Sequence, residues 1–153
     1  MKRILKILLA IILLGMAVAY YLYQKPTELL TSGNADFTYT IEELEAIGAT
    51  ESDTTFNQTH VGKKVELIGA ARAKNIQSSG ATIFFETENE NIIVAAAFDV
   101  SLNNDLQEIE LGSNLEILCI CNGIAKPEDP DDLLSETTIS FNRCSILNDS
   151  YKK

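Results

Sequence analysis

The sequence predicts a mainly β domain: a five-stranded barrel with a short helix between its third and fourth strands, preceded by an amphipathic helix and an N-terminal transmembrane helix. Three observations lead to this fold class. Five segments after residue 60 have the residue pattern of strands, a helical period interrupts them once, and an uncharged apolar run lies near the start of the chain.

The first 25 residues predict a signal anchor. Lys2, Arg3 and Lys6 precede seventeen uncharged residues, 7–23. Because basic residues next to an apolar span stay in the cytoplasm, the rest of the chain is expected on the other side of the bilayer. We therefore expect a single-pass inner-membrane protein whose C-terminal domain is periplasmic.

A cleaved signal peptide is the alternative to a retained anchor. Seventeen helical residues at about 1.5 Å each span roughly 25 Å, slightly less than a hydrocarbon core of about 30 Å. Residues 17–19 (Ala-Val-Ala) have the small-x-small form of a cleavage site after Ala19. Apolar character continues through Tyr23, which favours retention. Residues 26–35 are then a tether, and residues 36–150 form the domain.

The first element expected in the domain is a short amphipathic helix over residues 41–47. Thr40 is suited to be its N-cap, and Glu43, three residues later, completes a capping box. Gly48 is expected to end the helix.

Strand periodicity dominates the rest of the domain. In the first strand, Val65, Leu67, Gly69 and Ala71 share one face. A helical period appears at 99–111. The expected strands are residues 65–74, 82–86, 92–98, 115–121 and 137–146. Five strands with a helix between the third and fourth is the plan of an OB-fold barrel, which closes its sheet and so hides its edges.

The charge of the outer part is strongly negative. Residues 27–153 hold eight Lys and Arg against all twenty-two Asp and Glu, a net charge of −14. Such a field repels nucleic-acid phosphates and anionic lipid headgroups, so nucleic acid is a disfavoured partner unless the few cations gather on one face.

Several segments resemble the tRNA-anti-like OB-fold family. Residues 41–44 (Ile-Glu-Glu-Leu) and 61–69 (Val-Gly-Lys-Lys-Val-Glu-Leu-Ile-Gly) are similar to its opening pattern, and residues 121–123 and 141–146 to its closing pattern. The start of the chain, through Tyr21 to Pro26, resembles that of the family's membrane-anchored members. The resemblance covers about residues 36–147. It implies an OB barrel outside the inner membrane, with no established activity or catalytic residue.

Two departures from the family pattern matter. His60 stands where an aromatic residue is usual, and the loop 125–136 is long and acidic. Residues 128–132 (Glu-Asp-Pro-Asp-Asp) lack the alternating ligands and glycine of well-known calcium loops, so a solvated acidic loop is expected. His60 has no nucleophile near it in the sequence that it could activate as a general base, and we expect it on the surface.

The three cysteines predict one disulfide. Cys119 and Cys121 share a face of one strand, so a bridge between them would be strained. Strands four and five are neighbours in an OB barrel, and both this arrangement and the family resemblance favour Cys121 with Cys144, a pair that would oxidise outside the cytoplasm. Cys119 would remain a buried thiol. A zinc site is the disfavoured alternative, because His60 is the only histidine; no metal and no cofactor are expected.

A tentative ligand-binding site lies at the end of the first strand. Arg72 and Lys74 share its polar face, and Phe84 is expected beside them on the second strand. Cations with an aromatic ring are what an OB groove uses to bind a single nucleic-acid strand. Two such cations more commonly only keep a strand soluble.

Taken together, these patterns predict a membrane-anchored extracytoplasmic OB-fold binding module without catalytic activity. A protein partner or a small envelope ligand is favoured over single-stranded nucleic acid. An enzyme or enzyme subunit is the competing class, but the sequence has neither a glycine-rich phosphate loop nor a G-x-S-x-G motif.

Overall fold

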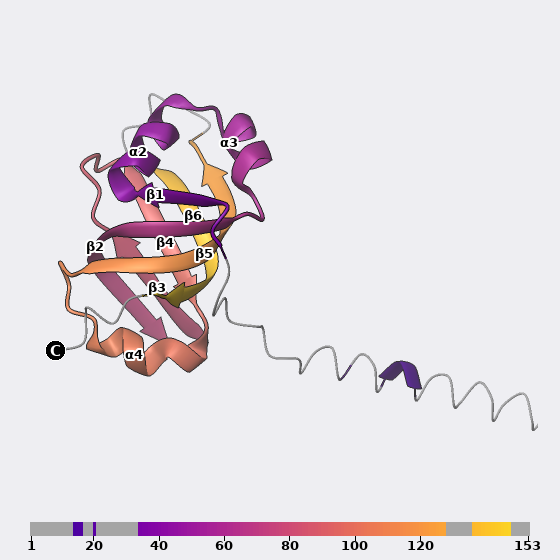
Figure 1. Ribbon diagram of the computed structural model, residues 1–153. Coiled ribbons are helices and arrows are strands. Elements are labelled where there is room, and N and C mark those ends of the chain that lie inside the picture. The colour runs from indigo at the N-terminus through magenta and orange to yellow at the C-terminus, as the bar shows by residue number, and fades with distance from the viewer. Residues whose placement is uncertain (1–13, 17–19, 21–33, 128–135, 148–153) are drawn as a thin grey trace, which may run out of the picture.

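The computed structural model describes residues 14–16, 20, 34–127 and 136–147. They include a β-barrel with α2 and α3 at one end and α4 at the other (Figure 1). In chain order the elements are β1 (Phe37–Thr40), α2 (Ile41–Thr50), α3 (Asp53–His60), β2 (Lys64–Gln77), β3 (Gly80–Phe85), β4 (Ile92–Phe98), the 3-10 turn η1 (Val100–Leu102), α4 (Asn103–Glu108), β5 (Asn114–Ala125) and β6 (Thr137–Ile146).

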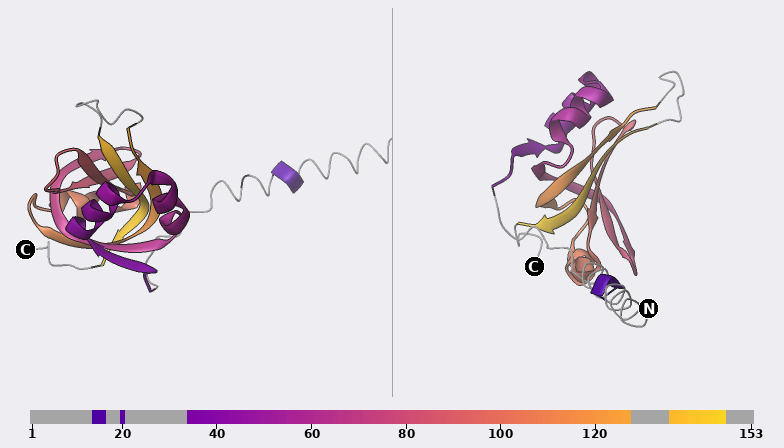
Figure 2. Two further views of the ribbon diagram at one scale, coloured as in Figure 1. Left: turned by 90° about the horizontal axis from the view of Figure 1, so that it is seen from above. Right: turned by 90° about the vertical axis from the view of Figure 1, so that its right-hand side faces the viewer.

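The sheet closes on itself. Its strand order is β1-β2-β3-β4-β6-β5, and an additional pairing of β2 with β5 completes a ring of five strands, seen from above in Figure 2 (left). Within the ring only β4 and β6 run parallel. With α4 between β4 and β5, this is the OB-fold plan that the sequence predicts.

The core lies inside the ring because side chains alternate along each strand. Every second residue of β3 and of β4 is buried, from Ala81 to Phe85 and from Ile92 to Phe98. Leu106 of α4 closes one end of the core, and Ile41 and Leu44 of α2 close the other. β4 and β6 have the predicted bounds, whereas β2, at 14 residues, is longer than predicted.

Helix α2 confirms the predicted cap and corrects the predicted end. Thr40 and Glu43 form the capping box in both directions. Gly48 does not end the helix, which continues to Thr50. The absence of a side chain at Gly48 serves packing, because a Cβ there would lie 2.9 Å from Cδ1 of Ile139. Lys126 donates to the carbonyl of Glu51, the residue that caps the end of α2.

Helix α3 is absent from the sequence-based prediction. Ser52 caps it, and only two of its residues, Phe56 and His60, are buried, so its polar sequence carries almost no helical period. A side-chain amide fixes it to the barrel. Asn57 donates to the carbonyl of Ile124 at 3.2 Å and accepts from that residue's N–H at 2.8 Å.

His60 joins α3 to β1, the other unpredicted element. β1 pairs in parallel with β2. The His60 ring is buried, not on the surface as expected; its Nδ1 lies 3.1 Å from the Phe56 carbonyl and its Nε2 3.1 Å from the Tyr39 hydroxyl. Phe37 and Phe56 pack against the ring with centroids 4.9 and 4.4 Å away. Tyr39 has a raised pKa because burial disfavours its charged form.

The disulfide joins Cys119 to Cys144, not Cys121 to Cys144 as predicted. The reason is a β-bulge. Leu118 pairs with Ser145 and Ile120 with Asn142, so Cys119 faces two residues of β6, Arg143 and Cys144. The extra residue shifts Cys144 toward Cys119. Cys121 is the buried free thiol instead, and burial raises its pKa to about 11.

No helix among the described residues is long and apolar enough to span a membrane. Apart from residues 14–16 and 20, the predicted anchor lies outside the described residues, as do positions 128–135 of the acidic loop. The anchor and its orientation therefore stay predictions.

Candidate binding site on the barrel surface

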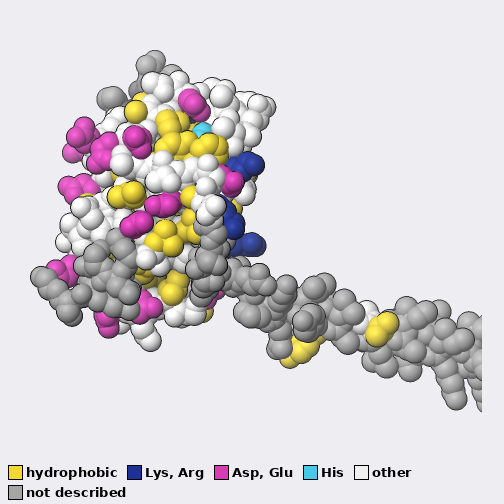
Figure 3. Space-filling view, viewed as in Figure 1, with side chains coloured by type: hydrophobic (Ala, Val, Ile, Leu, Met, Phe, Trp, Pro, Cys, Tyr) yellow, Lys and Arg dark blue, Asp and Glu magenta, His cyan; other side chains and the backbone are white. Residues whose placement is uncertain are grey.

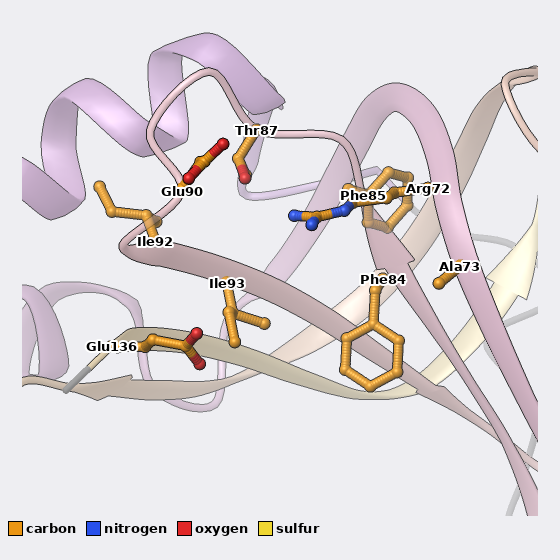
Figure 4. Close-up of a pocket in the computed structure, with 9 residues that line it drawn as sticks. All are labelled: Arg72, Ala73, Phe84, Phe85, Thr87, Glu90, Ile92, Ile93 and Glu136. Atoms are coloured by element: carbon orange, nitrogen blue, oxygen red, sulfur yellow. The ribbon is translucent and has the colours of Figure 1, made fainter. Parts of the chain in front are cut away.

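A pocket of about 280 Å³ lies on the outside of the barrel, over β2, β3 and β4 (Figure 4). Apolar side chains and three charged ones line it: Arg72, Ala73, Phe84, Phe85, Thr87, Glu90, Ile92, Ile93 and Glu136. β3 and β4 are the second and third strands of the ring, and Glu136 directly precedes β6 at the end of the loop after β5. These are the parts of an OB fold at which ligands commonly bind.

A second bulge, at Arg72, lies beside the pocket and separates Arg72 from Lys74. Ala71 pairs with Phe85 and Ala73 with Phe84, which leaves Arg72 without a partner on β3. An extra residue in one strand shifts the alternation of all residues after it. Ala73 therefore turns to the same outer face as Arg72 and Phe84. All three line the pocket, and Figure 4 shows the guanidinium of Arg72 reaching into the space above Ile93.

The same shift separates Lys74 from the predicted site. Lys74 pairs with the fully buried Ile83 and turns toward α4. Its Nζ donates to the carbonyls of Leu106, Gln107 and Ile109 at 3.3, 2.7 and 2.9 Å. A lysine that binds the last carbonyls of a helix satisfies groups that have no partner within the helix. Of the three predicted ligand-binding residues, the structure brings Arg72 and Phe84 together, while Lys74 supports α4.

Two carboxylates complete the pocket and were not predicted. Glu90 comes from the loop between β3 and β4, and Glu136 from the residue before β6. Figure 4 shows both on the side of the pocket opposite Arg72. The only signal for them in the sequence was their membership of two polar loops, which does not distinguish them from neighbouring acids.

The three charged groups of the pocket have no partners within the protein as described. None of Arg72, Glu90 and Glu136 forms a hydrogen bond or an ion pair with another described residue, and all three are exposed. The pocket floor is different, because Phe85 and Ile92 are buried and Phe84 and Ile93 are half-buried. Charged groups around an apolar floor are typical of a ligand site.

A buried carboxylate holds the loop that carries Glu90. Glu45 of α2 is only 7% exposed, and its two oxygens accept hydrogen bonds from the backbone N–H groups of Glu88 and Asn89 at 3.1 and 2.8 Å. Asn89 in turn accepts from the N–H of Asn91. The rim of the pocket is therefore fixed to the helix above it.

Cations are scarce around the pocket. Of the six Lys and Arg among the described residues of the domain, Lys74 and Lys126 bind backbone carbonyls. Lys63, Lys64 and Arg143 lie near one another, because Lys64 pairs with Ile120, and Ile120 with Asn142. Figure 3 shows cations gathered at one edge of the face in view and acidic side chains elsewhere on it. Arg72 is the one cation of the described domain that lines the pocket.

The sequence raises two other chemistries, a metal site and a general base at His60. Within the part of the chain that the structure describes, no group of three or more His, Cys, Asp or Glu side chains is arranged to hold a metal. His60 has both ring nitrogens in hydrogen bonds inside the protein.

Comparison with solved structures shows the same fold. A candidate nucleic acid-binding lipoprotein from Klebsiella pneumoniae has a TM-score of 0.50 at 13% identity, over 72% of this chain and 91% of that chain. A candidate aspartyl-tRNA synthetase from Leishmania major has a TM-score of 0.44 at 11% identity, over 86% of this chain and 26% of that one.

The chain of a Stn1–Ten1 complex from S. pombe has a TM-score of 0.35 at 12% identity, over 56% of this chain and 59% of that one. This chain spans about a quarter of the length of the Leishmania major synthetase chain. No protein-family model and no curated protein matches the sequence.

Proposed function

We propose that this protein is a membrane-anchored, extracytoplasmic OB-fold module that binds a protein segment or a small envelope ligand and has no catalytic activity of its own. The observation that carries the proposal is the pocket on the barrel surface, where Arg72, Glu90 and Glu136 stand without described partners around an apolar floor. The basic–apolar start of the chain supports the location, and the segments similar to tRNA-anti-like proteins support the module's relationship to that family.

Charge favours this binding mode over a phosphate backbone. The pocket holds one cation and two carboxylates. The other cations of the described domain are bound to carbonyls or lie just before β2, at its first residue and on β6. A nucleic-acid strand is bound mainly through several phosphate contacts along a positive groove. A polypeptide or a small polar ligand does not need such a groove.

Cross-linking in intact envelopes tests the proposal. A photoreactive residue placed at Thr87, on the pocket rim, should cross-link the full chain to a reproducible species. The cross-link should be lost in Arg72→Ala and kept in Lys63→Ala, which removes an exposed cation that directly precedes β2 and does not line the pocket. Equal cross-linking in both variants would reject the pocket as the binding site, and turnover of an envelope substrate by the purified chain would reject the non-catalytic role.

Single-stranded nucleic acid is the second candidate, and one observation favours it. Arg72 and Phe84 line one pocket on the OB-fold face, so a base could stack on the ring while the guanidinium binds a phosphate. The Klebsiella lipoprotein with the same fold is named as a candidate nucleic acid-binding protein. The purified full chain should then retard an oligonucleotide at low salt, and Arg72→Glu should abolish the shift while Lys63→Glu leaves most of it. No shift at tens of micromolar protein would end this candidate.

A further inference from the structure

The charges of the pocket are separated in space. Figure 4 shows the guanidinium of Arg72 on one side and the carboxylates of Glu90 and Glu136 on the other, with Ile93 between them. A ligand that carried only an anion would meet one favourable group and two repulsive ones. A ligand that carried only a cation would meet Arg72 as the repulsive group. A ligand with both charges at its two ends satisfies all three side chains.

The size and the floor of the pocket restrict the body of such a ligand. About 280 Å³ is at or just below the lower end of ligand-pocket volumes, roughly 300–1,000 Å³. The half-buried Phe84 and Ile93 offer an apolar surface between the charged sides. Methylene groups suit such a surface, as in the stem of a lysine side chain.

From these observations we infer that the pocket binds a small ligand of the amino-acid class, with a carboxylate on Arg72, an apolar stem over Phe84 and Ile93, and one or two ammonium groups at Glu90 and Glu136. The inference rests on the proposed binding function and names the ligand class of the same site. The two carboxylates against one guanidinium, together with the −14 charge of the outer part, favour a ligand whose net charge is zero or positive.

The rigid rim is consistent with selection between such ligands. Glu45 holds the backbone of Glu88 and Asn89, so Glu90 starts from a loop that is already positioned. A pre-organised site loses less conformational entropy on binding, and it discriminates by leaving a charged group unpaired when the ligand lacks the matching one.

Titration of the full chain, purified in detergent, tests the inference with four probes. L-lysine carries a carboxylate and two ammonium groups, 6-aminohexanoate one of each, cadaverine only ammonium groups, and diacetyl-lysine only the carboxylate. Affinity should fall by about tenfold or more from lysine to cadaverine and to diacetyl-lysine, the loss expected for one charged hydrogen-bonding group. 6-Aminohexanoate should lie between lysine and the two single-charge probes.

Variants of the pocket show which side chains bind each end of the ligand. Arg72→Ala should reduce lysine affinity and should not reduce the affinity of cadaverine, which has no carboxylate for Arg72 and gains from the loss of its repulsion. The double variant Glu90→Gln with Glu136→Gln should reduce lysine affinity to that of diacetyl-lysine. Lys63→Ala should change neither. Far-ultraviolet circular dichroism of each variant should match the wild type, since these side chains have no described partners.

The outcomes separate the two proposals. Equal affinity for lysine and diacetyl-lysine, or no saturable binding of lysine, overturns the ligand class. If the Arg72-dependent cross-link in envelopes persists in that case, the binding module stands with another ligand. An oligonucleotide shift that depends on Arg72 and is not displaced by lysine overturns the inference in favour of nucleic acid.

Discussion

The two bulges that moved the predicted contacts both have an arginine as the extra residue, yet they do different work. In β2, Arg72 has no partner on β3 and its side chain enters a pocket. In β6, Arg143 has a φ of 52°, its side chain is exposed, and the shift it causes brings Cys144 to Cys119. At the first bulge the extra residue itself lines a pocket, and at the second the extra residue brings its neighbour into a covalent bond.

This difference shows that a single extra residue can separate side chains that stabilise the fold from side chains that have no described partner. After the β2 bulge, Lys74 turns to α4 and binds three carbonyls, while Arg72, two positions earlier, stays without a described partner. After the β6 bulge, Cys144 is bonded and Cys121 is left as a buried thiol. Six measurements test this comparison.

Loss of the disulfide should have the largest effect. The double variant Cys119→Ser with Cys144→Ser should lower the free energy of unfolding by about 3 kcal/mol, because the bond constrains the unfolded chain across 25 residues. Urea denaturation of the full chain measures this.

Intact mass decides which cysteines are paired. Reduction should add about two daltons to the Cys121→Ser variant and nothing to Cys119→Ser. The reverse result would show that the β6 bulge does not align Cys144 with Cys119.

The free thiol should resist alkylation. Because burial raises the pKa of Cys121 to about 11 from a usual 9, its thiolate fraction at pH 8 should be about 100-fold lower than that of an ordinary thiol. The rate of reaction with iodoacetamide should rise until the pH passes about 11. The pKa is higher in the folded state, so stability should fall as the pH rises from 9 to 11. A thiol that reacts at an ordinary rate at pH 8 would contradict this burial.

Substitution of Lys74 should destabilise the domain without a direct effect on the pocket. Lys74→Met keeps the apolar stem but leaves the carbonyls of Leu106, Gln107 and Ile109 without their donor, a loss of about 2 kcal/mol. Lys63→Met serves as the control. Lys63 is exposed and directly precedes β2, so this variant should change the free energy of unfolding little. Equal effects in the two variants would mean that the contacts with α4 contribute nothing.

Replacement of Arg143 by glycine at the β6 bulge should stabilise the domain slightly. Arg143→Gly removes a side chain from the left-handed region, which favours glycine, and the gain is reduced by the greater freedom of glycine in the unfolded chain. We expect about 0.5 kcal/mol in urea denaturation. A loss of more than about 1 kcal/mol would show that the arginine side chain itself supports the fold.

The smallest effect on stability is expected at Arg72. Its side chain is exposed and has no described partner, so Arg72→Ala should change the unfolding free energy by less than about 0.5 kcal/mol. The same variant should lose the cross-link at the pocket. A large loss of stability would place Arg72 with Lys74 among the supporting residues.

Periodicity predicted the elements whose burial follows a regular pattern. β4 and β6 have the predicted bounds because residues 92–98 and 137–146 combine β-branched and aromatic residues with clear limits. The capping box at Thr40 was also visible, since capping depends on residues three positions apart. Of the site, Arg72 and Phe84 were predicted to lie together, and they do.

The elements and site residues that the sequence did not predict share a different cause. α3 and β1 are held by contacts that are distant in the sequence, such as Asn57 with Ile124 and His60 with Tyr39. Glu90 and Glu136 are 46 positions apart and meet at one pocket only because β4 pairs with β6. No local pattern records such pairings.

The amino-acid sequence by itself determined the five-stranded plan, the amphipathic helix with its cap, the acidity of the domain and the basic–apolar character of its start, because these depend on residues that are close in the chain. The tertiary structure alone decided which cysteines bond, which cation supports a helix and which three charges surround a pocket. The physical reason is the pairing of strands that are distant in the chain. Such pairing brings Glu90 and Glu136 to one pocket, and it stabilises bulges in which one extra residue reverses the side on which the following side chains of that strand lie.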